Sequence, residues 1–378
     1  MMFRLSEEYL NFRDGIRDFV DKHVRPKSMK LDETAEFPMD TYRMMGERGL
    51  FGLTVPKEYD GSGRDSLYLP IAVEEVAKGC ASTGSILAAA ELSIIPLLKF
   101  GTEKQKQKYV KPLVSGKKIG AFALTEPDAG SDAGNQSTTA TLSGDEYVIS
   151  GTKRYIFNGS KANTIVLFAT VDKSKGPKGI CAFIVESNYP GFRVSKIENK
   201  MGIRAADTAE LTLENLRVPV ENLLGKEGEG FKIALSTLDY GRIGIASQAL
   251  GIAQAALDES IKHAKTRVQF GKPIGEFQAI QWMLAEVATD IDAARLLVYR
   301  AAIMMDTGER FSKEASMAKL FASQTATKAT DYAVQIHGGS GYMKDCVIER
   351  LYRDTRITEI YEGTSEVQKM VIAGNLLR

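Results

Sequence analysis

One acidic residue, Glu362, has a setting that suits proton-transfer chemistry. It stands beside Gly363, between an apolar dipeptide and a pair of hydroxyl residues. A carboxylate can act as a general base where the fold excludes water and raises its pKa. The chain contains 48 acidic residues, however, and most such residues are solvated surface groups, so these neighbours alone do not identify Glu362 as catalytic.

Two glycine-rich segments could bring backbone N–H groups close to a ligand. Residues 123–134 combine hydroxyl side chains with turn residues and could hold a polar ring edge or a phosphate. Residues 335–342 follow an expected helix, and their glycines would permit close approach of a ligand. Each segment also has an ordinary structural explanation, an interdomain loop for the first and a helix C-cap with a turn for the second.

Several other kinds of chemistry are disfavoured. The three cysteines and three histidines are scattered, which argues against a disulfide framework, a metal site or a histidine-based triad. There is no G-x-G-x-x-G motif after a strand and no P-loop motif, so nicotinamide Rossmann and P-loop enzymes are disfavoured. The net charge of +1 argues against a nucleic-acid partner, because phosphate binding usually needs a clustered basic surplus.

The first third of the chain is expected to be helical. Ser6 is placed to cap a helix whose apolar residues share one face and which Pro26 ends. Thr102 and Gln105 form a capping-box pattern that opens another helix. The small-residue stretch 80–90 suits a tightly packed buried helix.

The remainder divides into a β module and a helical region. Short β-branched and aromatic runs separated by glycines fill residues 147–219, which indicates an all-β module of about 100 residues. Ala-rich helices are expected at 243–265 and 313–336. Between them, apolar residues recur at alternating spacings of four and three, the seam of a left-handed helix bundle: Ile280, Leu284, Val287, Ile291, Ala294, Val298, Ala301 and Met305.

No targeting or membrane segment is apparent. The N-terminal sequence has no apolar signal core, and its acidic residues are unsuited to a transit peptide. The longest uncharged stretch, residues 243–257, is too short and too rich in small residues to span a bilayer. The sequence therefore predicts a soluble intracellular protein that binds neither membrane nor nucleic acid.

Together these segments resemble the acyl-CoA dehydrogenase family. Residues 123–134 match the first family signature, and residues 335–354, with Asp345 and Arg350 at the expected spacing, match the second. Residues 357–368 are similar to the catalytic-base segment, and residues 267–278 resemble the flavin-contacting loop. The likeness covers the whole chain in order and is strongest to short-chain, butyryl-type members, including those of anaerobic bacteria.

The resemblance implies an α+β multidomain fold. Its parts would be an N-terminal α-helical domain (1–121), a middle β-barrel or sandwich domain (122–222) and a C-terminal four-helix bundle (223–378). FAD would lie between the β domain and the bundle, with part of its site supplied by a neighbouring subunit of a homotetramer. The electron acceptor would be electron-transferring flavoprotein, and we expect a cytoplasmic, bacterial location.

The resemblance also assigns binding roles. Residues matching FAD contacts are Phe122, Leu124, Thr125, Ser131, Tyr155, Ile156, Phe157, Arg267, Gln269, Phe277, Gln278, Thr364 and Glu366, with Gln335, Gly338 and Gly339 acting from the neighbouring subunit. Residues matching substrate contacts are Ser131, Asp239 and Arg242 for the CoA moiety and Gly363 for the acyl group.

Glu362 matches the catalytic base of the family. It would take the α proton of the thioester while the β hydrogen leaves as hydride to flavin N5, and hydrogen bonds to the thioester oxygen would stabilise the developing enolate. Some members carry the base at the position of Gly241. Glycine cannot serve, which favours Glu362.

Three residues depart from the family pattern. Tyr155 stands where Trp is usual, and Phe157 stands where Thr usually bonds flavin N5, a bond that Phe157 cannot make. Glu91 lies in the helix that lines the acyl pocket in relatives. It is interpreted either as a surface or inter-helix acid, or as a pocket carboxylate that binds a polar acyl tail or serves as a second base.

The sequence therefore predicts FAD-dependent conversion of an acyl-CoA thioester to the trans-2-enoyl-CoA. The reverse reaction is an alternative, as an enoyl-, arylacrylyl- or cyclic acyl-CoA reductase of an anaerobe, because sequence does not set reaction direction. A non-catalytic helical scaffold would explain the bundle seam equally well, but such a protein would be colourless.

Overall fold

Two apolar helices form the centre of the N-terminal part in the computed structural model, which describes residues 4–377. They are α4 (Tyr68–Gly79) and α5 (Ala81–Phe100), and nearly every residue of both is buried. Gly84 lets the two backbones approach, because a Cβ there would lie 2.6 Å from Cα of Ala77. Shorter helices surround the pair: α1 (Glu7–Phe19), α2 (Ser28–Thr34), α3 (Met39–Glu47) and α6 (Glu103–Val114).

The first helical run begins as predicted and ends later than predicted. Ser6 occupies the N-cap of α1. The expectation that Pro26 ends the run is wrong, because the chain continues through a π turn (Val20–Val24) and a 3-10 turn (Arg25–Lys27) into α2. A proline in the first turn of a helix gives up an N–H that has no intrahelical acceptor, so Pro26 is accommodated there.

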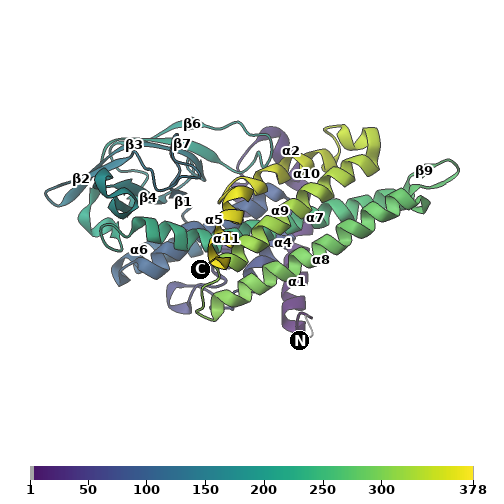
Figure 1. Ribbon diagram of the computed structural model, residues 1–378, viewed down its shortest axis with the longest axis horizontal. Coiled ribbons are helices and arrows are strands. Elements are labelled where there is room, and N and C mark those ends of the chain that lie inside the picture. Colours follow the sequence, from purple (N-terminus) through teal and green to yellow (C-terminus); the bar gives the residue numbers. More distant parts are fainter. Residues whose placement is uncertain (1–3, 378) are drawn as a thin grey trace.

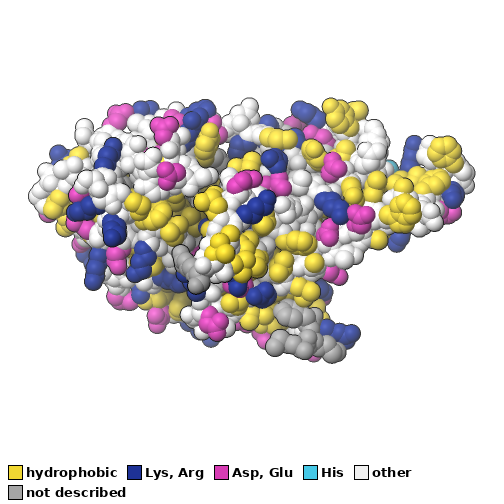
Figure 2. Space-filling model, in the orientation of Figure 1, with side chains coloured by type: hydrophobic (Ala, Val, Ile, Leu, Met, Phe, Trp, Pro, Cys, Tyr) yellow, Lys and Arg dark blue, Asp and Glu magenta, His cyan; other side chains and the backbone are white. Residues whose placement is uncertain are grey.

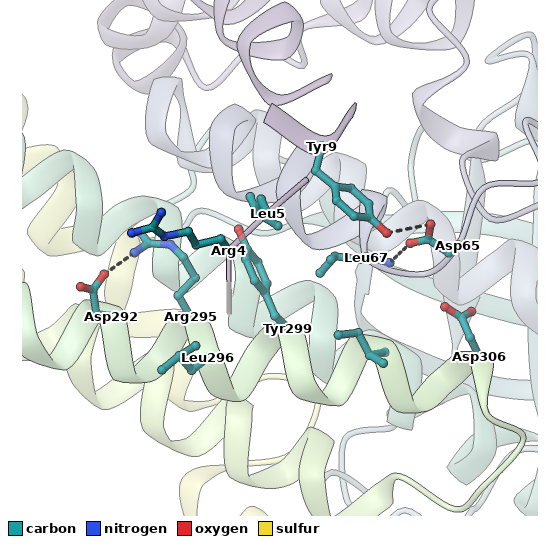
Figure 3. Close-up of a pocket in the computed structure, with 11 residues that line it drawn as sticks. Arg4, Leu5, Tyr9, Asp65, Leu67, Asp292, Arg295, Leu296, Tyr299 and Asp306 are labelled. Carbon is teal, nitrogen blue, oxygen red and sulfur yellow. Dashed lines mark hydrogen bonds and ion pairs between the residues drawn. The ribbon is translucent and has the colours of Figure 1, made fainter. Parts of the chain in front are cut away.

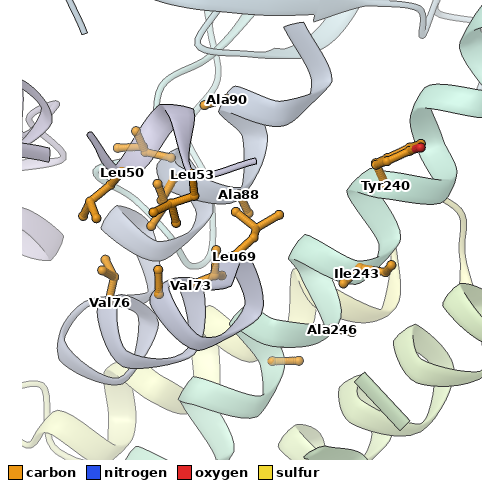
Figure 4. Close-up of a cluster of buried hydrophobic side chains, with 14 of the residues drawn as sticks. Leu50, Leu53, Leu69, Val73, Val76, Ala88, Ala90, Tyr240, Ile243 and Ala246 are labelled. Atoms are coloured by element: carbon orange, nitrogen blue, oxygen red, sulfur yellow. The ribbon is translucent and has the colours of Figure 1, made fainter. Parts of the chain in front are cut away.

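Helix α5 is long and apolar enough to cross a membrane by length and composition. However, 89% of its most apolar window is buried inside the protein. Figure 4 shows its Ala88, with Leu69 and Val73 of α4, facing Ile243 and Ala246 of α7 (Gly230–Thr266). The apolar character of α5 is therefore accounted for by the helical core.

The middle of the chain forms one eight-stranded sheet with its own apolar core. The strand order is β6-β7-β3-β2-β4-β5-β8, with β1 pairing parallel to β4. Strands β4 and β5 are almost entirely buried, which is expected where helices cover one face of a sheet and its own core the other. The strands are β1 (Gly120–Ala123), β2 (Thr139–Ser143), β3 (Glu146–Phe157), β4 (Thr164–Thr170), β5 (Ile180–Glu186), β6 (Phe192–Ile197), β7 (Thr208–Pro219) and β8 (Leu223–Leu224).

The C-terminal part is a bundle of long helices that lie side by side (Figure 1). They are α7, α8 (Gln278–Asp306) and α9 (Ser312–His337), followed by the shorter α10 (Val347–Thr355) and α11 (Ser365–Leu376). A hairpin of β9 (Val268–Gln269) and β10 (Lys272–Pro273) joins α7 to α8. The predicted seam is confirmed, since every one of its residues on α8 is buried or half-buried.

Two features lock the three parts together. The guanidinium of Arg353 in α10 pairs with Asp32 of α2 at 2.6 Å and donates to the carbonyl of Met201, which lies between β6 and β7, at 3.0 Å. Gly230, the first residue of α7, lies directly against the backbone of Cys181 in β5. The first half of α7 therefore runs between the sheet and α5, and these elements bound a common space.

Candidate active site

A cavity of about 330 Å³ lies where the sheet, α5, α7 and the segment before α11 meet. The sheet side provides an apolar and aromatic wall, and the helix side brings the charged groups. The predicted site residues that line it are Phe122, Leu124, Thr125, Ser131, Tyr155, Ile156, Phe157, Arg242, Glu362 and Gly363. The fold thus gathers residues from four distant segments around one space.

Other lining residues escaped the sequence prediction. They are Ser85, Ala89 and Leu92 of α5, Phe231, Leu235, Leu238 and Ile245 of α7, and Tyr361 and Val367 near Glu362. The small-residue stretch 80–90 was a signal for the first group, because small side chains leave space beside a helix. The apolar residues of α7 follow an ordinary helical pattern, and nothing in that pattern separates a cavity wall from a core.

Glu362 presents a shielded carboxylate to the cavity. The residue as a whole is half-buried, but its Oε2 is inaccessible to solvent and has no hydrogen-bond partner among residues 4–377. Gly241 provides the room, because a Cβ at this position would collide with Oε2. Burial raises the pKa of Glu362 to about 7, and the positive charges of Lys319 and Arg242 limit this rise.

The backbone around Glu362 is held in an unfavourable conformation. Its φ of 53° lies in the left-handed region that side chains other than glycine rarely adopt. Lys319 Nζ donates to the carbonyl of Gly363 at 2.7 Å, and Gln368 Nε2 donates to the carbonyls of Gly363 and Glu362 at 2.8 and 3.1 Å. Thr364 caps α11, since its hydroxyl accepts from the N–H of Val367 at 3.3 Å.

Arg242 is a second buried charge at the cavity. Its guanidinium pairs with Asp239 at 2.6 Å, and Asp239 also accepts a hydrogen bond from the hydroxyl of Ser312. Burial lowers the pKa of Arg242, which the neighbouring carboxylates Asp239 and Glu362 oppose. Asp239 does not line the cavity and contacts it only through Arg242.

A buried ion pair supports the wall of the cavity on the sheet side. Lys153 Nζ lies 2.7 Å from Glu126 Oε1 and also donates to the carbonyl of Leu124 at 3.2 Å. Glu126 in turn accepts from the backbone N–H groups of Ser137 and Thr138. The loop that carries Leu124 and its neighbours is therefore fixed from behind by groups that the cavity does not expose.

The chain matches one family along its length. Residues 6–117, 121–216 and 228–377 match, in order, the families described as acyl-CoA dehydrogenase N-terminal domain, middle domain and C-terminal domain. The chain belongs to the acyl-CoA dehydrogenase family. Members of this family are FAD-dependent oxidoreductases, so this chain is an oxidoreductase whose cofactor is FAD. The helical scaffold suggested by the bundle seam alone is thereby disfavoured.

Relatives in the acyl-CoA dehydrogenase family align over the full chain. The short-chain specific acyl-CoA dehydrogenase of Clostridium acetobutylicum is 50% identical over 100% of both chains. The acryloyl-CoA reductase (NADH) of Anaerotignum propionicum is 48% identical over 100% of this chain and 96% of that protein. A chain in the solved structure described as the electron transferring flavoprotein of Acidaminococcus fermentans is 50% identical, covers 100% of both chains and has a TM-score of 0.99.

The cavity suits the cofactor of the acyl-CoA dehydrogenase family. Its walls are mainly apolar and aromatic, with a few polar groups that converge on it, the pattern of a cofactor or small-molecule site. Glu362 Oε2 and Arg242 Nε are buried without a hydrogen-bond partner among the described residues. Buried polar atoms normally have partners, so the lack of one marks both atoms as candidates to interact with a bound ligand.

Thr364 and Glu366 lie within three residues of the lining residue Gly363, but seven other predicted FAD contacts lie far from this cavity. Arg267, Gln269, Phe277 and Gln278 belong to the hairpin end of the bundle, and Gln335, Gly338 and Gly339 end α9 nearby. The rings of His263 and His337 stack at 4.2 Å, which brings these two groups together. Helical rise places the end of α7 roughly 36 Å from Arg242, so one FAD cannot reach both places within one chain.

Glu91 does not line the cavity, although one of its two sequence interpretations made it a pocket carboxylate. The α5 residues that do so are Ser85, Ala89 and Leu92, and Glu91 is absent from the described lining residues. At 100° per residue, Glu91 projects from the side of α5 that carries Gly84, which packs on α4. The reading as a buried inter-helix acid therefore fits better than the reading as a pocket carboxylate.

A wider groove, of about 820 Å³, lies between the N-terminal segment and α8 (Figure 3). Its charged groups Asp65, Arg295, Asp292 and Asp306 already have partners. Asp65 accepts a hydrogen bond from the hydroxyl of Tyr9 at 2.9 Å, and Asp306 accepts one from the backbone N–H of Ser66 at 2.9 Å. Arg295 forms an ion pair with Asp292 at 2.8 Å. These contacts are structural, and they leave the smaller cavity as the candidate active site.

Proposed function

We propose that the enzyme dehydrogenates a short-chain acyl-CoA thioester to the trans-2-enoyl-CoA, with Glu362 accepting the α proton. The observation that carries this proposal is the carboxylate of Glu362 at the wall of the cavity, whose Oε2 is shielded and has no hydrogen-bond partner among residues 4–377. The short-chain class is supported by the 50% identity to the short-chain specific enzyme of Clostridium acetobutylicum.

Several residues would prepare Glu362 for this step. The apolar walls exclude water, which makes the ionised carboxylate a stronger base. Gly241 leaves space for the carboxylate to reach a bound thioester, and Arg242 offers a buried cation to the CoA moiety. Ser131 is exposed at the rim of the same cavity, where it could also meet CoA.

The sheet-side wall would hold the isoalloxazine ring of FAD. The residues in position are Phe122, Leu124, Thr125, Tyr155, Ile156 and Phe157. When bound there, FAD supplies the acceptor for the hydride that leaves the β carbon. Phe157 lines the wall without a hydroxyl, so it adds packing but no hydrogen bond.

We further propose that a second copy completes the FAD site, within a homotetramer. The hairpin and the end of α9 carry further predicted FAD contacts, such as Arg267 and Gln335, which cannot reach the cavity of their own chain. Phe270 at the hairpin tip is 94% exposed, and Trp282 of α8 is 62% exposed. Figure 2 shows hydrophobic side chains at this tip, as expected for a surface that packs on another subunit.

Electron-transferring flavoprotein is the proposed electron acceptor. The chain from the Acidaminococcus fermentans structure supports this choice, because that structure is described as an electron transferring flavoprotein. The cytoplasm of a bacterium is the proposed location, in line with the Clostridium relative. Glu366, exposed in the first turn of α11, stays a proposed FAD contact.

A substrate panel tests the proposed reaction. Purified enzyme is mixed without oxygen with butyryl-, hexanoyl-, glutaryl-, cyclohexanecarboxyl- and phenylpropionyl-CoA, and the flavin absorbance is followed. Butyryl-CoA should bleach the flavin fastest. A yellow enzyme that none of the five thioesters bleaches would contradict the proposal, and faster bleaching by the cyclic or aryl thioester would correct the substrate class.

The reverse reaction is a second candidate, favoured by the 48% identity to an acryloyl-CoA reductase. It needs the same cavity and the same carboxylate, which would then return a proton to the α carbon. The two directions are separated by mixing chemically reduced enzyme with crotonyl-CoA and comparing the rate of flavin reoxidation with the rate of bleaching by butyryl-CoA. If crotonyl-CoA reoxidises the flavin much faster than butyryl-CoA bleaches it, the enzyme is assigned as a reductase.

A further inference from the structure

Lys319 is a buried lysine that forms no ion pair with a carboxylate in the part of the chain that the structure describes. It lies in the middle of α9, and its side chain is fully buried. No ion pair among residues 4–377 includes it, and the hydrogen bond of its ammonium goes to the carbonyl of Gly363 at 2.7 Å. A buried ammonium is costly unless nearby charges and hydrogen bonds offset the loss of water, so its surroundings have to supply that compensation.

The charges around Lys319 come from four elements. On α7, Arg242 repels it, with Asp239 paired to Arg242. The segment before α11 contributes Glu362, the largest favourable charge for Lys319, and α11 contributes Glu366. Glu359, in the 3-10 turn Arg356–Glu359, adds a further negative charge, although that carboxylate is paired with Arg356.

We propose that Lys319 is a positioning residue for the proposed reaction, tethering the backbone beside Glu362 and favouring the ionised form of its carboxylate. This inference rests on the proposed role of Glu362 as the base. The tether acts on Gly363, directly next to the left-handed residue Glu362. The charge acts through space, since the buried ammonium is one of the two cations that oppose the effect of burial on Glu362.

Gln368 makes it possible to separate these two effects. Its Nε2 donates to the same Gly363 carbonyl at 2.8 Å, and also to the carbonyl of Glu362, but it carries no charge. Removal of Gln368 therefore weakens the tether and leaves the ammonium in place. Removal of Lys319 takes away the tether and the charge together.

The experiment compares the pH dependence of flavin bleaching in holoenzyme variants. Bleaching by saturating butyryl-CoA is followed from pH 5.5 to 9 for the wild type, Lys319→Met, Lys319→Gln, Lys319→Arg and Gln368→Met. FAD content and melting temperature are measured for each variant, so that a variant which fails to fold is recognised. Lys319→Gln retains an N–H donor without the charge and serves as a second charge-removing variant.

The acid limb of the profile is the decisive readout. Both charge-removing variants should move it upward by about one pH unit or more, the effect expected for loss of an opposite charge close to a carboxylate. Lys319→Arg should keep the wild-type limb. Gln368→Met should lower the rate at every pH and leave the limb in place, because it alters only the tether.

Two results would overturn the inference. One is an acid limb of the pH profile that stays at its wild-type position in a folded, FAD-loaded Lys319→Met or Lys319→Gln enzyme. The other is an equal shift in Gln368→Met, which would mean that the backbone position and not the charge sets the limb. Failure of the proposed function looks different, because the wild type itself would then not bleach, or would bleach with no acid limb.

Discussion

Two glutamates, Glu362 and Glu91, share their chemistry and differ in their surroundings. Each has an Oε2 that solvent cannot reach and that has no hydrogen-bond partner among the described residues. Burial raises the pKa of each to about 7. Glu362 borders a cavity, with Lys319 and Arg242 nearby, whereas Glu91 points into the helical core.

A raised pKa alone does not identify a catalytic base. For Glu91 the rise comes from burial alone, with no charge nearby to offset it. For Glu362 burial also dominates and two cations oppose it, and its carboxylate borders a ligand space. Since both pKa values are about 7, access to a substrate separates the functional acid from the structural one.

The largest expected effect separates the two residues by activity. Glu362→Gln should slow flavin bleaching by butyryl-CoA by about a thousandfold, within the factors of 10² to 10⁴ that a general base commonly contributes. Glu91→Gln should bleach within about twofold of the wild type, because its side chain lies away from the cavity. Stopped-flow absorbance on FAD-loaded variants measures both rates of bleaching. A large loss of bleaching rate in Glu91→Gln across aliphatic, cyclic and aryl thioesters would instead support the interpretation of Glu91 as a pocket carboxylate.

A smaller effect is expected when Glu362 is displaced and not removed. In Gly241→Ala the new Cβ would collide with Oε2 of Glu362, so the carboxylate must move. We expect kcat/KM to fall by roughly a hundredfold, as misplacement of a catalytic group by about 1 Å can do. Gly244→Ala, whose Cβ would lie 3.1 Å from that of Ala88, is the control one helical turn away. Equal losses in both variants would show that the effect is general to α7.

Glu91 should reveal itself through the pH dependence of stability. Its folded pKa of about 7 exceeds the ordinary value of 4.5, so the folded state holds its proton more tightly. The contribution of protonated Glu91 to the free energy of unfolding is complete below pH 4.5 and is lost as the pH rises towards 7. Glu91→Gln cannot lose a proton, so relative to the wild type it should gain on the order of 1–3 kcal/mol between pH 4.5 and pH 8.

Denaturant unfolding of the two proteins at pH 5 and pH 8 measures this difference. The wild type should lose stability relative to Glu91→Gln on going to the higher pH. If the two proteins keep a constant difference at both pH values, Glu91 titrates normally and is not the desolvated acid described here.

Local signals in the sequence predicted much of the fold. The capping box of α6 is present, with Gln105 Oε1 accepting from the Thr102 N–H at 2.9 Å, because such a motif acts within one turn. The alternating seam of α8 is buried since it depends only on helical period. Pro26 misled the prediction because proline stops a helix from its interior but not from its first turn.

The site was harder to predict, because it depends on which elements meet. Glu362, Arg242 and the sheet-side wall came from family motifs, and the fold brings them around one cavity. Leu235 and Leu238 line that cavity without any distinguishing pattern, since a cavity wall and a core share one periodicity. The sequence left Glu91 open between an inter-helix acid and a pocket carboxylate, because composition shows that a helix is buried but not which face meets a ligand.

Exchange of the α proton tests the role of Glu362 most directly, because it isolates proton removal from hydride transfer. A thioester with sulfur in place of its β carbon cannot lose a hydride, so its α-proton exchange in D₂O, followed by NMR, reports the base alone. The wild type should exchange the proton with a midpoint near pH 7, as the pKa of Glu362 predicts, and Glu362→Gln should exchange it at least about a thousandfold more slowly. Exchange by Glu362→Gln at the wild-type rate and with the same midpoint would contradict the assignment of this carboxylate as the base.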